Sequence, residues 1–207
     1  LMKQIVVLGG YGNFGKRIVE NLSLLDEITI YIAGRNLIKA GQCVEQLKAA
    51  AKSTLKPLVI DIFANDFEDK LAQLSPYLVI HTSGPYQGQN YDVAKTCIKL
   101  GAHYIDLADD RRFVCDISTL NKDATENNVL VVSGASSVPG LSSAVIDEYI
   151  SQFDAIDSLD LSIAPGNKAE RGLATVRAIL SYTGHPFKVY KDGIWQDIYG
   201  WMDSRVN

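Results

Sequence analysis

Short apolar runs and amphipathic stretches alternate along most of the chain. Short runs of mainly apolar residues predict buried strands at 4–8, 28–33, 57–60, 78–82, 103–107 and 129–133. Between them, apolar residues recur at helical spacing, and the last such helix is predicted over 141–151. Asn36 and Asn65 are predicted to cap the second and third of these helices. Strands that alternate with helices favour a parallel sheet joined by right-handed crossovers. Residues 1–153 are therefore predicted to form one α/β domain.

The pattern changes after that domain. Residues 158–163 alternate apolar and polar positions like a half-exposed strand, and 173–180 carry apolar residues at helical spacing. Apolar runs on both sides of Asp192-Gly193 predict a β-hairpin. We predict the start of a mixed α+β substrate or dimerisation domain over 154–207. One helix and one hairpin bury too little surface to be stable alone, so we expect a truncated domain from a longer protein. Packing against the first domain, or against a second copy in a homodimer, is the alternative.

A glycine-rich segment joins the first predicted strand to the first predicted helix. Gly10, Gly12 and Gly15 have the G-x-G-x-x-G spacing of a dinucleotide-binding turn. The three glycines are expected to make the tight turn, to let the backbone approach a diphosphate and to let the helix pack on the strand. The helix N-terminus adds N–H groups and a positive partial charge. A glycine-rich turn that binds nothing is the alternative, but the flanking strand and helix fit the binding context. The coenzyme contacts predicted in this loop are Gly10, Tyr11, Gly12, Asn13, Phe14 and Gly15.

Together with this turn, the six strands predict a Rossmann-type doubly wound parallel sheet. The residue that ends its second strand indicates which coenzyme is bound. NAD-binding folds place an acid there, about 20 residues past the glycines, whereas this chain has Arg35. A guanidinium forms a charge-assisted fork with a 2′-phosphate, so Arg35 favours NADP over NAD. A solvated surface arginine is the alternative. Asp61, at the end of the third strand, is expected near the adenine or else simply starts a turn.

Loops after the later strands are further candidates, because ligands bind beyond the carboxyl ends of the strands in an open α/β sheet. They contain Ser83, Gly84, Pro85 and Tyr86 after the fourth strand, and Ala135 and Ser136 after the sixth. We expect the first four and Ala135 to contact the coenzyme, and Tyr86 and Ser136 to face the substrate. An ordinary Gly-Pro turn and a loop that only caps the next helix are the alternatives.

Ionisable residues supply candidates for catalysis and substrate binding. Asp109 and Tyr104, near the end of the fifth strand, are candidates for proton transfer. Alternatively, the acids after that strand stabilise a helix N-terminus. Lys168 and Arg171 in the second region are candidates for holding a substrate carboxylate, and a solvated loop is the alternative for each.

Composition excludes several classes of function. The net charge is −4 and no basic cluster stands out, which argues against a nucleic-acid partner or an anionic membrane surface. No apolar stretch approaches the ~20 residues of a membrane span. No metal-ligand spacing links the histidines to Cys43, Cys97 and Cys115, so no metal is expected. These cysteines are expected to be reduced, in a cytoplasmic protein without a signal peptide before its first strand.

Several of these segments occur together and in order, as in saccharopine dehydrogenase-like oxidoreductases, which the chain resembles over nearly its whole length. The segments are Gly9-Gly10-Tyr11-Gly12-Asn13-Phe14-Gly15, Ala33-Gly34-Arg35-Asn36, Gly84-Pro85-Tyr86, Gly101-Ala102-His103-Tyr104-Ile105-Asp106-Leu107, Ser133-Gly134-Ala135-Ser136-Ser137-Val138-Pro139-Gly140 and Gly184-His185-Pro186-Phe187.

The resemblance implies hydride transfer between NADP(H) and an imine or secondary amine of a small, amino-acid-like substrate. It implies coenzyme contacts at Gly10, Gly12, Gly15 and Arg35, and nicotinamide-side loops at 83–86 and 135–139. We interpret the protein as such an oxidoreductase. An NADP(H)-binding sensor or interaction module without catalysis is the alternative.

Overall fold

The computed structural model describes residues 2–159, 161–164, 166, 168 and 172–200. Its strands are β1 (Lys3–Leu8), β2 (Ile28–Gly34), β3 (Thr54–Val59), β4 (Leu78–His81), β5 (His103–Asp106), β6 (Val131–Val132), β7 (Pro186–Lys191) and β8 (Ile194–Tyr199). The α-helices are α1 (Asn13–Leu22), α2 (Leu37–Leu47), α3 (Phe67–Ala72), α4 (Asp92–Lys99), α5 (Arg111–Asp116), α6 (Asn121–Glu126), α7 (Ser142–Tyr149) and α8 (Leu173–Ser181).

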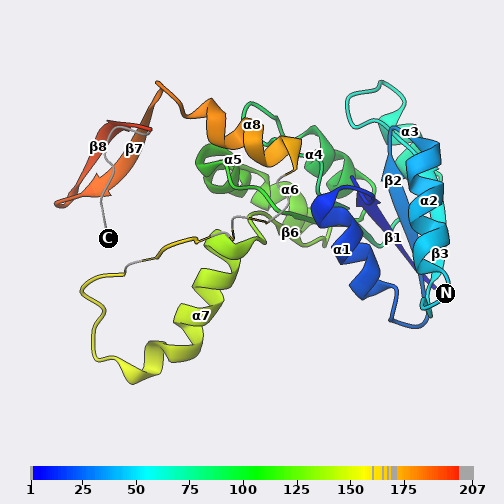
Figure 1. Ribbon diagram of the computed structural model, residues 1–207, viewed down its shortest axis with the longest axis horizontal. Coiled ribbons are helices and arrows are strands. Elements are labelled where there is room, and N and C mark those ends of the chain that lie inside the picture. The colour runs from blue at the N-terminus through cyan, green and yellow to red at the C-terminus, as the bar shows by residue number, and fades with distance from the viewer. Residues whose placement is uncertain (1, 160, 165, 167, 169–171, 201–207) are drawn as a thin grey trace.

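The first six strands form one sheet in the order β3-β2-β1-β4-β5-β6, with all neighbours parallel. Helices flank this sheet, as Figure 1 shows. The strand order reverses between β1 and β4, and in this fold a ligand binds at the carboxyl end of that switch point. The doubly wound Rossmann-type fold predicted from the sequence is confirmed.

The core has two layers because successive strand residues point to opposite faces of the sheet. Val6 and Leu8 of β1 belong to the cluster with α3, α4 and α6, whereas Ile5 and Val7 belong to the cluster with α1 and α2. Burial on both faces explains why the strands read as continuous apolar runs instead of alternating ones. The two packed layers hold the carboxyl edge of the sheet rigidly.

Some elements differ from their predicted bounds. β3 begins at Thr54 and contains Pro57 opposite Ile32, which is tolerated because β3 is the edge strand of the sheet. β6 is shorter than predicted, and the described residues of 158–163 form no strand. Asn65 does not cap α3: the residue at the N-cap is Asp66, without a side-chain bond.

The helix and hairpin predicted late in the chain are confirmed as α8 and β7–β8. Positive φ angles at Asp192 (53°) and Gly193 (78°) fit the hairpin turn that this dipeptide favours. The guanidinium of Arg111 donates a hydrogen bond to the carbonyl of Lys188 and lies 5.0 Å from the ring centroid of Trp195. The hairpin therefore contacts the first domain through α5. The division at residue 153 stays a prediction.

Candidate coenzyme and active site

The loop between β1 and α1 folds back on the end of β2. The N–H groups of Gly9 and Gly10 both donate to the carbonyl of Ala33, at 2.8 and 3.1 Å, and the N–H of Gly12 donates to the carbonyl of Gly9 at 2.8 Å. Gly9 has a φ of +78°, a left-handed conformation that glycine adopts without strain. Sequence reasoning assigned the tight turn to Gly10 and missed Gly9.

The N-terminus of α1 is open toward the mouth of the sheet. Its N-cap residue is Gly12, which has no side chain to cap it, and the N–H groups of Phe14 and Gly15 have no partner among the described residues. Uncapped N–H groups and the helix dipole form a site for an anion such as a phosphate. A Cβ at Gly15 would lie 2.2 Å from the carbonyl oxygen of Gly9, so only glycine allows this approach of α1 to the loop.

Tyr11 connects the glycine loop to the segment around Arg35, the residue predicted to determine coenzyme preference. Its hydroxyl accepts a hydrogen bond of 3.0 Å from the N–H of Asn36, and its ring covers Gly34, where a Cβ would lie 2.6 Å away. Asn36 caps α2, as predicted, by accepting a bond from the N–H of Lys39. Arg35 lies between these two anchored residues and has an exposed side chain. The backbone of Arg35 is thus fixed while its side chain stays accessible to a ligand.

A cavity of about 360 Å³ runs along the β2–β3 side of this loop, and we name it the adenosine-side cavity because this fold holds an adenosine on that side. It brings together the predicted residues Tyr11, Gly12, Arg35, Asp61, Ser83, Gly84 and Pro85. Asp61 starts a turn by accepting a bond from the N–H of Phe63, and it also lines the cavity, while its position near the adenine stays a prediction. Arg177 of α8 also lines the cavity, and sequence reasoning did not single it out.

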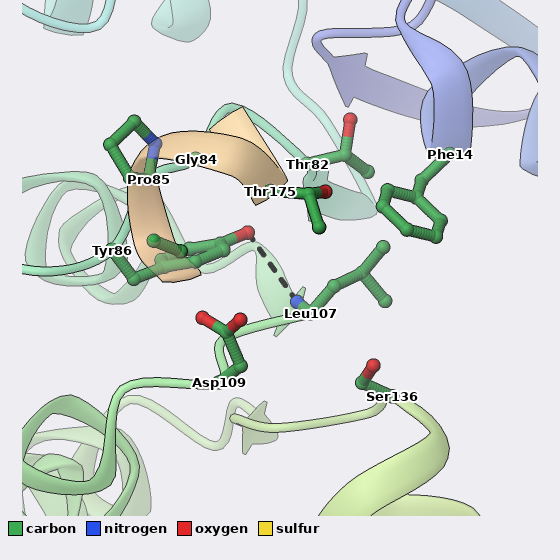
Figure 2. Close-up of a pocket in the computed structure, with 10 residues that line it drawn as sticks. Phe14, Thr82, Gly84, Pro85, Tyr86, Leu107, Asp109, Ser136 and Thr175 are labelled. Carbon is green, nitrogen blue, oxygen red and sulfur yellow. Dashed lines mark hydrogen bonds between the residues drawn. The ribbon is translucent and has the colours of Figure 1, made fainter. Parts of the chain in front are cut away.

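A second cavity of about 120 Å³ lies on the β4–β5 side of the loop (Figure 2). Its lining includes Phe14, Thr82, Gly84, Pro85, Tyr86, Leu107, Asp109, Ser136, Thr175 and Ala178. Asp109 extends into it below Tyr86, and Ser136 faces it from the opposite loop. The Nε2 amide of Gln87 donates to Oδ1 of Asp109 at 3.3 Å. An exposed carboxylate next to the coenzyme loop is suited to proton exchange or to binding an ammonium group.

Tyr86 contributes its ring to this cavity, while its hydroxyl serves the backbone. The hydroxyl donates to the carbonyl of His81 at 2.6 Å and accepts from the N–H of Leu107 at 3.4 Å, the bond drawn in Figure 2. Burial, with a smaller contribution from the charge of Asp106, raises the pKa of Tyr86 above its usual range. Tyr86 therefore shapes the pocket and does not release a proton there.

The structure corrects the prediction that Tyr104 transfers a proton. Tyr104 is 1% exposed, it lines neither cavity described above, and its hydroxyl donates to Oδ2 of Asp106 at 2.8 Å. Burial and the charge of Asp106 raise the pKa of Tyr104 well above its usual range. Its hydroxyl is a structural hydrogen-bond donor.

Asp106 is a buried centre that sequence reasoning did not identify as important. Its side chain is fully buried, and its Oδ1 accepts from the N–H groups of Ala108 and Gly134, both at 2.9 Å, and from the hydroxyl of Ser133 at 2.8 Å. With Tyr104 on Oδ2, the carboxylate has four donors. These bonds fix the loops after β5 and β6, which carry Asp109 and Ser136. An aspartate followed by Leu-Ala after a short strand gives no distinctive signal in the sequence.

His81 fixes the loop after β4. Its Nδ1 accepts from the N–H of Ser83 at 3.3 Å, so its Nε2 proton points to Oε1 of Gln89, also at 3.3 Å. Burial lowers the pKa of His81, which keeps the ring neutral. The amide of Gln89 donates to the carbonyls of Ser83 and Pro85 at 3.0 and 2.6 Å. The backbone of the 83–86 loop is therefore fixed by the side chains of His81 and Gln89.

The remaining predicted residues are Ala135, Lys168 and Arg171. Ala135 and Ser136 line a shallow hollow with Phe14 beside α7, and the N–H of Ala135 donates to the carbonyl of Asp106. Lys168 is exposed in a turn and lines neither cavity. Arg171 lies outside the described residues.

Over the part of the chain that the structure describes, His, Cys, Asp and Glu form no group of three or more that could hold a metal. Cys43 and Cys97 are buried, and Cys115 is exposed. No helix in the described part is long and apolar enough to cross a membrane.

Comparison with known proteins identifies the family. The sequence matches the saccharopine dehydrogenase NADP-binding domain over residues 5–132. A search of curated proteins gave no match. Among solved structures, saccharopine dehydrogenase (L-Glu forming) from Saccharomyces cerevisiae has a TM-score of 0.55 at 19% identity, covering 72% of this chain and 32% of that one. A short-chain dehydrogenase from Mycobacterium smegmatis has a TM-score of 0.53 at 14% identity, covering 70% of this chain and 84% of that one.

At these identities the two structures establish a shared fold, and the chain spans about a third of the yeast enzyme. The match over 5–132 includes the glycine loop, Arg35, Asp61 and Asp109. It extends over more than half of the chain and names NADP as the coenzyme. This chain therefore belongs to the saccharopine dehydrogenase family and carries that family's NADP-binding domain.

Proposed function

We propose that this protein is an NADP(H)-dependent oxidoreductase that acts on an imine or secondary amine of an amino-acid-like substrate. The observation that carries the proposal is one continuous surface. The open N-terminus of α1 and the guanidinium of Arg35 border the same crevice, and Asp109 faces the cavity on the far side of the loop. Bound NADP(H) supplies the hydride.

The residues of the adenosine-side cavity would bind and orient the coenzyme. Phe14 and Gly15 would donate their N–H groups to the diphosphate, and Arg35 would pair with the 2′-phosphate. Asp61 would lie at the adenine. With the coenzyme held in this way, the nicotinamide would extend toward Tyr86 and the 83–86 loop. Because Gln89 and His81 hold that loop, it would form a rigid floor that keeps water from the reacting carbon.

Asp109 would exchange the proton that accompanies hydride transfer. It is the one acid among the described residues that line the smaller cavity, and Ser136 faces the same space. An imine accepts hydride at carbon and a proton at nitrogen, so a carboxyl group near the nitrogen serves both directions of the reaction. Arg171 and Lys168 remain predicted partners for a substrate carboxylate, and packing of the second region against another copy in a homodimer remains an alternative.

Turnover tests this assignment. NADPH consumption, followed by its near-ultraviolet absorbance against pairs of amino acids and keto acids, should be detectable for at least one pair. Asp109→Asn should lower kcat by about a hundredfold or more, the usual contribution of a general acid, and should leave the Kd for NADPH unchanged. Glu27→Gln, an exposed acid in the turn before β2, is the control.

Equal rates for the Asp109→Asn variant and the wild type would remove Asp109 from the mechanism. NADPH binding without turnover of any pair would favour the sensor alternative over the oxidoreductase.

A further inference from the structure

Helix α8 contributes residues to both cavities of the crevice that the coenzyme would occupy. At its start, a Cβ on Gly172 would lie 3.8 Å from the Cβ of Asn13 in the glycine loop. Further along, Thr175 and Ala178 line the smaller cavity, and Ala178 is 5% exposed. Arg177, between them in sequence, lines the adenosine-side cavity. One helix from the second region therefore faces both halves of the crevice.

The charges around the adenosine-side cavity favour an anion with two charged groups. Its described lining carries Arg35 and Arg177, with Asp61 as the acid. Neither guanidinium has a hydrogen bond or an ion pair with the described residues, whereas Oδ1 of Asp61 already accepts from a backbone N–H. The lining is thus net positive in a chain whose net charge is −4. Two exposed arginines that line one cavity are suited to bind an anion there.

The two arginines come from elements that are far apart in the sequence. Arg35 follows β2, beside the position of the adenosine ribose in this fold. Arg177 comes from α8, which begins against the glycine loop, where the diphosphate of a dinucleotide lies. NADP has two anionic groups, the diphosphate and the 2′-phosphate. Each arginine therefore has its own partner.

We propose that Arg177 binds the diphosphate of the coenzyme from the side opposite the glycine loop, and that α8 forms the outer wall of the crevice. The proposal rests on the proposed NADP(H) binding. A guanidinium across from the N–H groups of α1 places the diphosphate between two donor sets. Coenzyme binding would then hold α8 against the first domain, so the second region would take part in coenzyme affinity.

Titrations of the chain with NADPH and with NADH, followed by calorimetry, test this role. Arg177→Ala should weaken the binding of both coenzymes by about tenfold each, because both carry the diphosphate, and the loss of one charge-assisted bond corresponds to about that factor. Arg177→Lys keeps the charge and should recover part of the loss. Arg112→Ala, an exposed arginine on α5 that lines neither cavity, should bind like the wild type.

Fragments of the coenzyme test binding of the diphosphate and of the 2′-phosphate separately. ADP carries the diphosphate and 2′-AMP carries only the 2′-phosphate, so Arg177→Ala should weaken ADP binding and leave 2′-AMP binding unchanged. Circular dichroism and the melting temperature verify that each variant is folded.

If the wild type binds NADPH and Arg177→Ala binds both coenzymes as tightly as the wild type does, Arg177 does not bind the diphosphate. The proposed NADP(H) binding would still stand. Weakened binding of NADPH but not of NADH would overturn the assignment to the diphosphate. If the folded wild-type chain binds neither coenzyme, the proposed function and this inference fail together.

Discussion

Asp106→Ala is expected to lower the free energy of unfolding by about 3–5 kcal/mol, the usual cost of breaking a buried charged network. The variant removes the acceptor for four buried or half-buried donors, which belong to Tyr104, Ala108, Ser133 and Gly134. Each buried donor left without a partner costs about 1–3 kcal/mol before water or relaxation recovers part of it. Since a domain is stable by only about 5–15 kcal/mol, this loss is a large share of the total.

Two further variants distinguish the loss of the Asp106 hydrogen bonds from a general effect of removing an aspartate. Asp106→Asn retains an oxygen for the three donors on Oδ1 and should cost less, about 1–2 kcal/mol. Asp26→Ala, at an exposed position in the turn after α1, should change stability by no more than about 0.5 kcal/mol. Urea unfolding followed by circular dichroism measures all three. If Asp106→Ala and Asp26→Ala have the same unfolding midpoint, Asp106 does not organise the two loops.

Gly15→Ala is expected to weaken NADPH binding by about a hundredfold, equivalent to losing one or two charge-assisted hydrogen bonds. The new Cβ would lie 2.2 Å from the carbonyl oxygen of Gly9 and 2.8 Å from Cα of Gly10. Both atoms are backbone, so α1 or the loop has to shift, and the N–H groups that face the phosphate shift with it. Overpacking of this kind also lowers the free energy of unfolding by about 1–3 kcal/mol.

Gly41→Ala is the matched control for this substitution. A Cβ at Gly41, inside α2, meets nothing within 4 Å. Alanine favours a helix over glycine, so this variant should be more stable by about 0.5–1 kcal/mol and should bind NADPH normally. Binding by calorimetry and thermal unfolding are measured on both variants. The expected loss of NADPH affinity for Gly15→Ala is about a hundredfold. An affinity within a factor of about two of the wild type would refute the tight packing of the loop on α1.

Sequence patterns predicted the fold and the part of the candidate site formed by the glycine loop and Arg35. The buried strands and the glycine spacing are local signals, so the order of elements, the open N-terminus of α1 and the position of Arg35 followed from them. Asn36 capped its helix as expected because capping depends on neighbouring residues.

Contacts between distant segments were not predictable in the same way. The four donors to Asp106 come from β5 and from the loops after β5 and β6, and only the folded sheet brings them together. The burial of Tyr104 has the same origin, because the phenol packs beneath helices that a single strand does not reveal. Arg177 itself lies more than 140 residues after the end of β2 in sequence, and nothing in its neighbourhood indicates that it shares a cavity with Arg35.

The central claim is that this crevice binds NADP(H) and that Arg35 recognises the 2′-phosphate. The most direct measurement is the Kd of NADPH and of NADH for the wild type and for Arg35→Ala, by isothermal titration calorimetry. The wild type should prefer NADPH, and Arg35→Ala should lose about ten- to a hundredfold in NADPH affinity while NADH affinity stays within about a factor of two, since one charge-assisted contact is lost. A variant that retains the full preference for NADPH, or a wild type that binds both coenzymes equally, would contradict the claim.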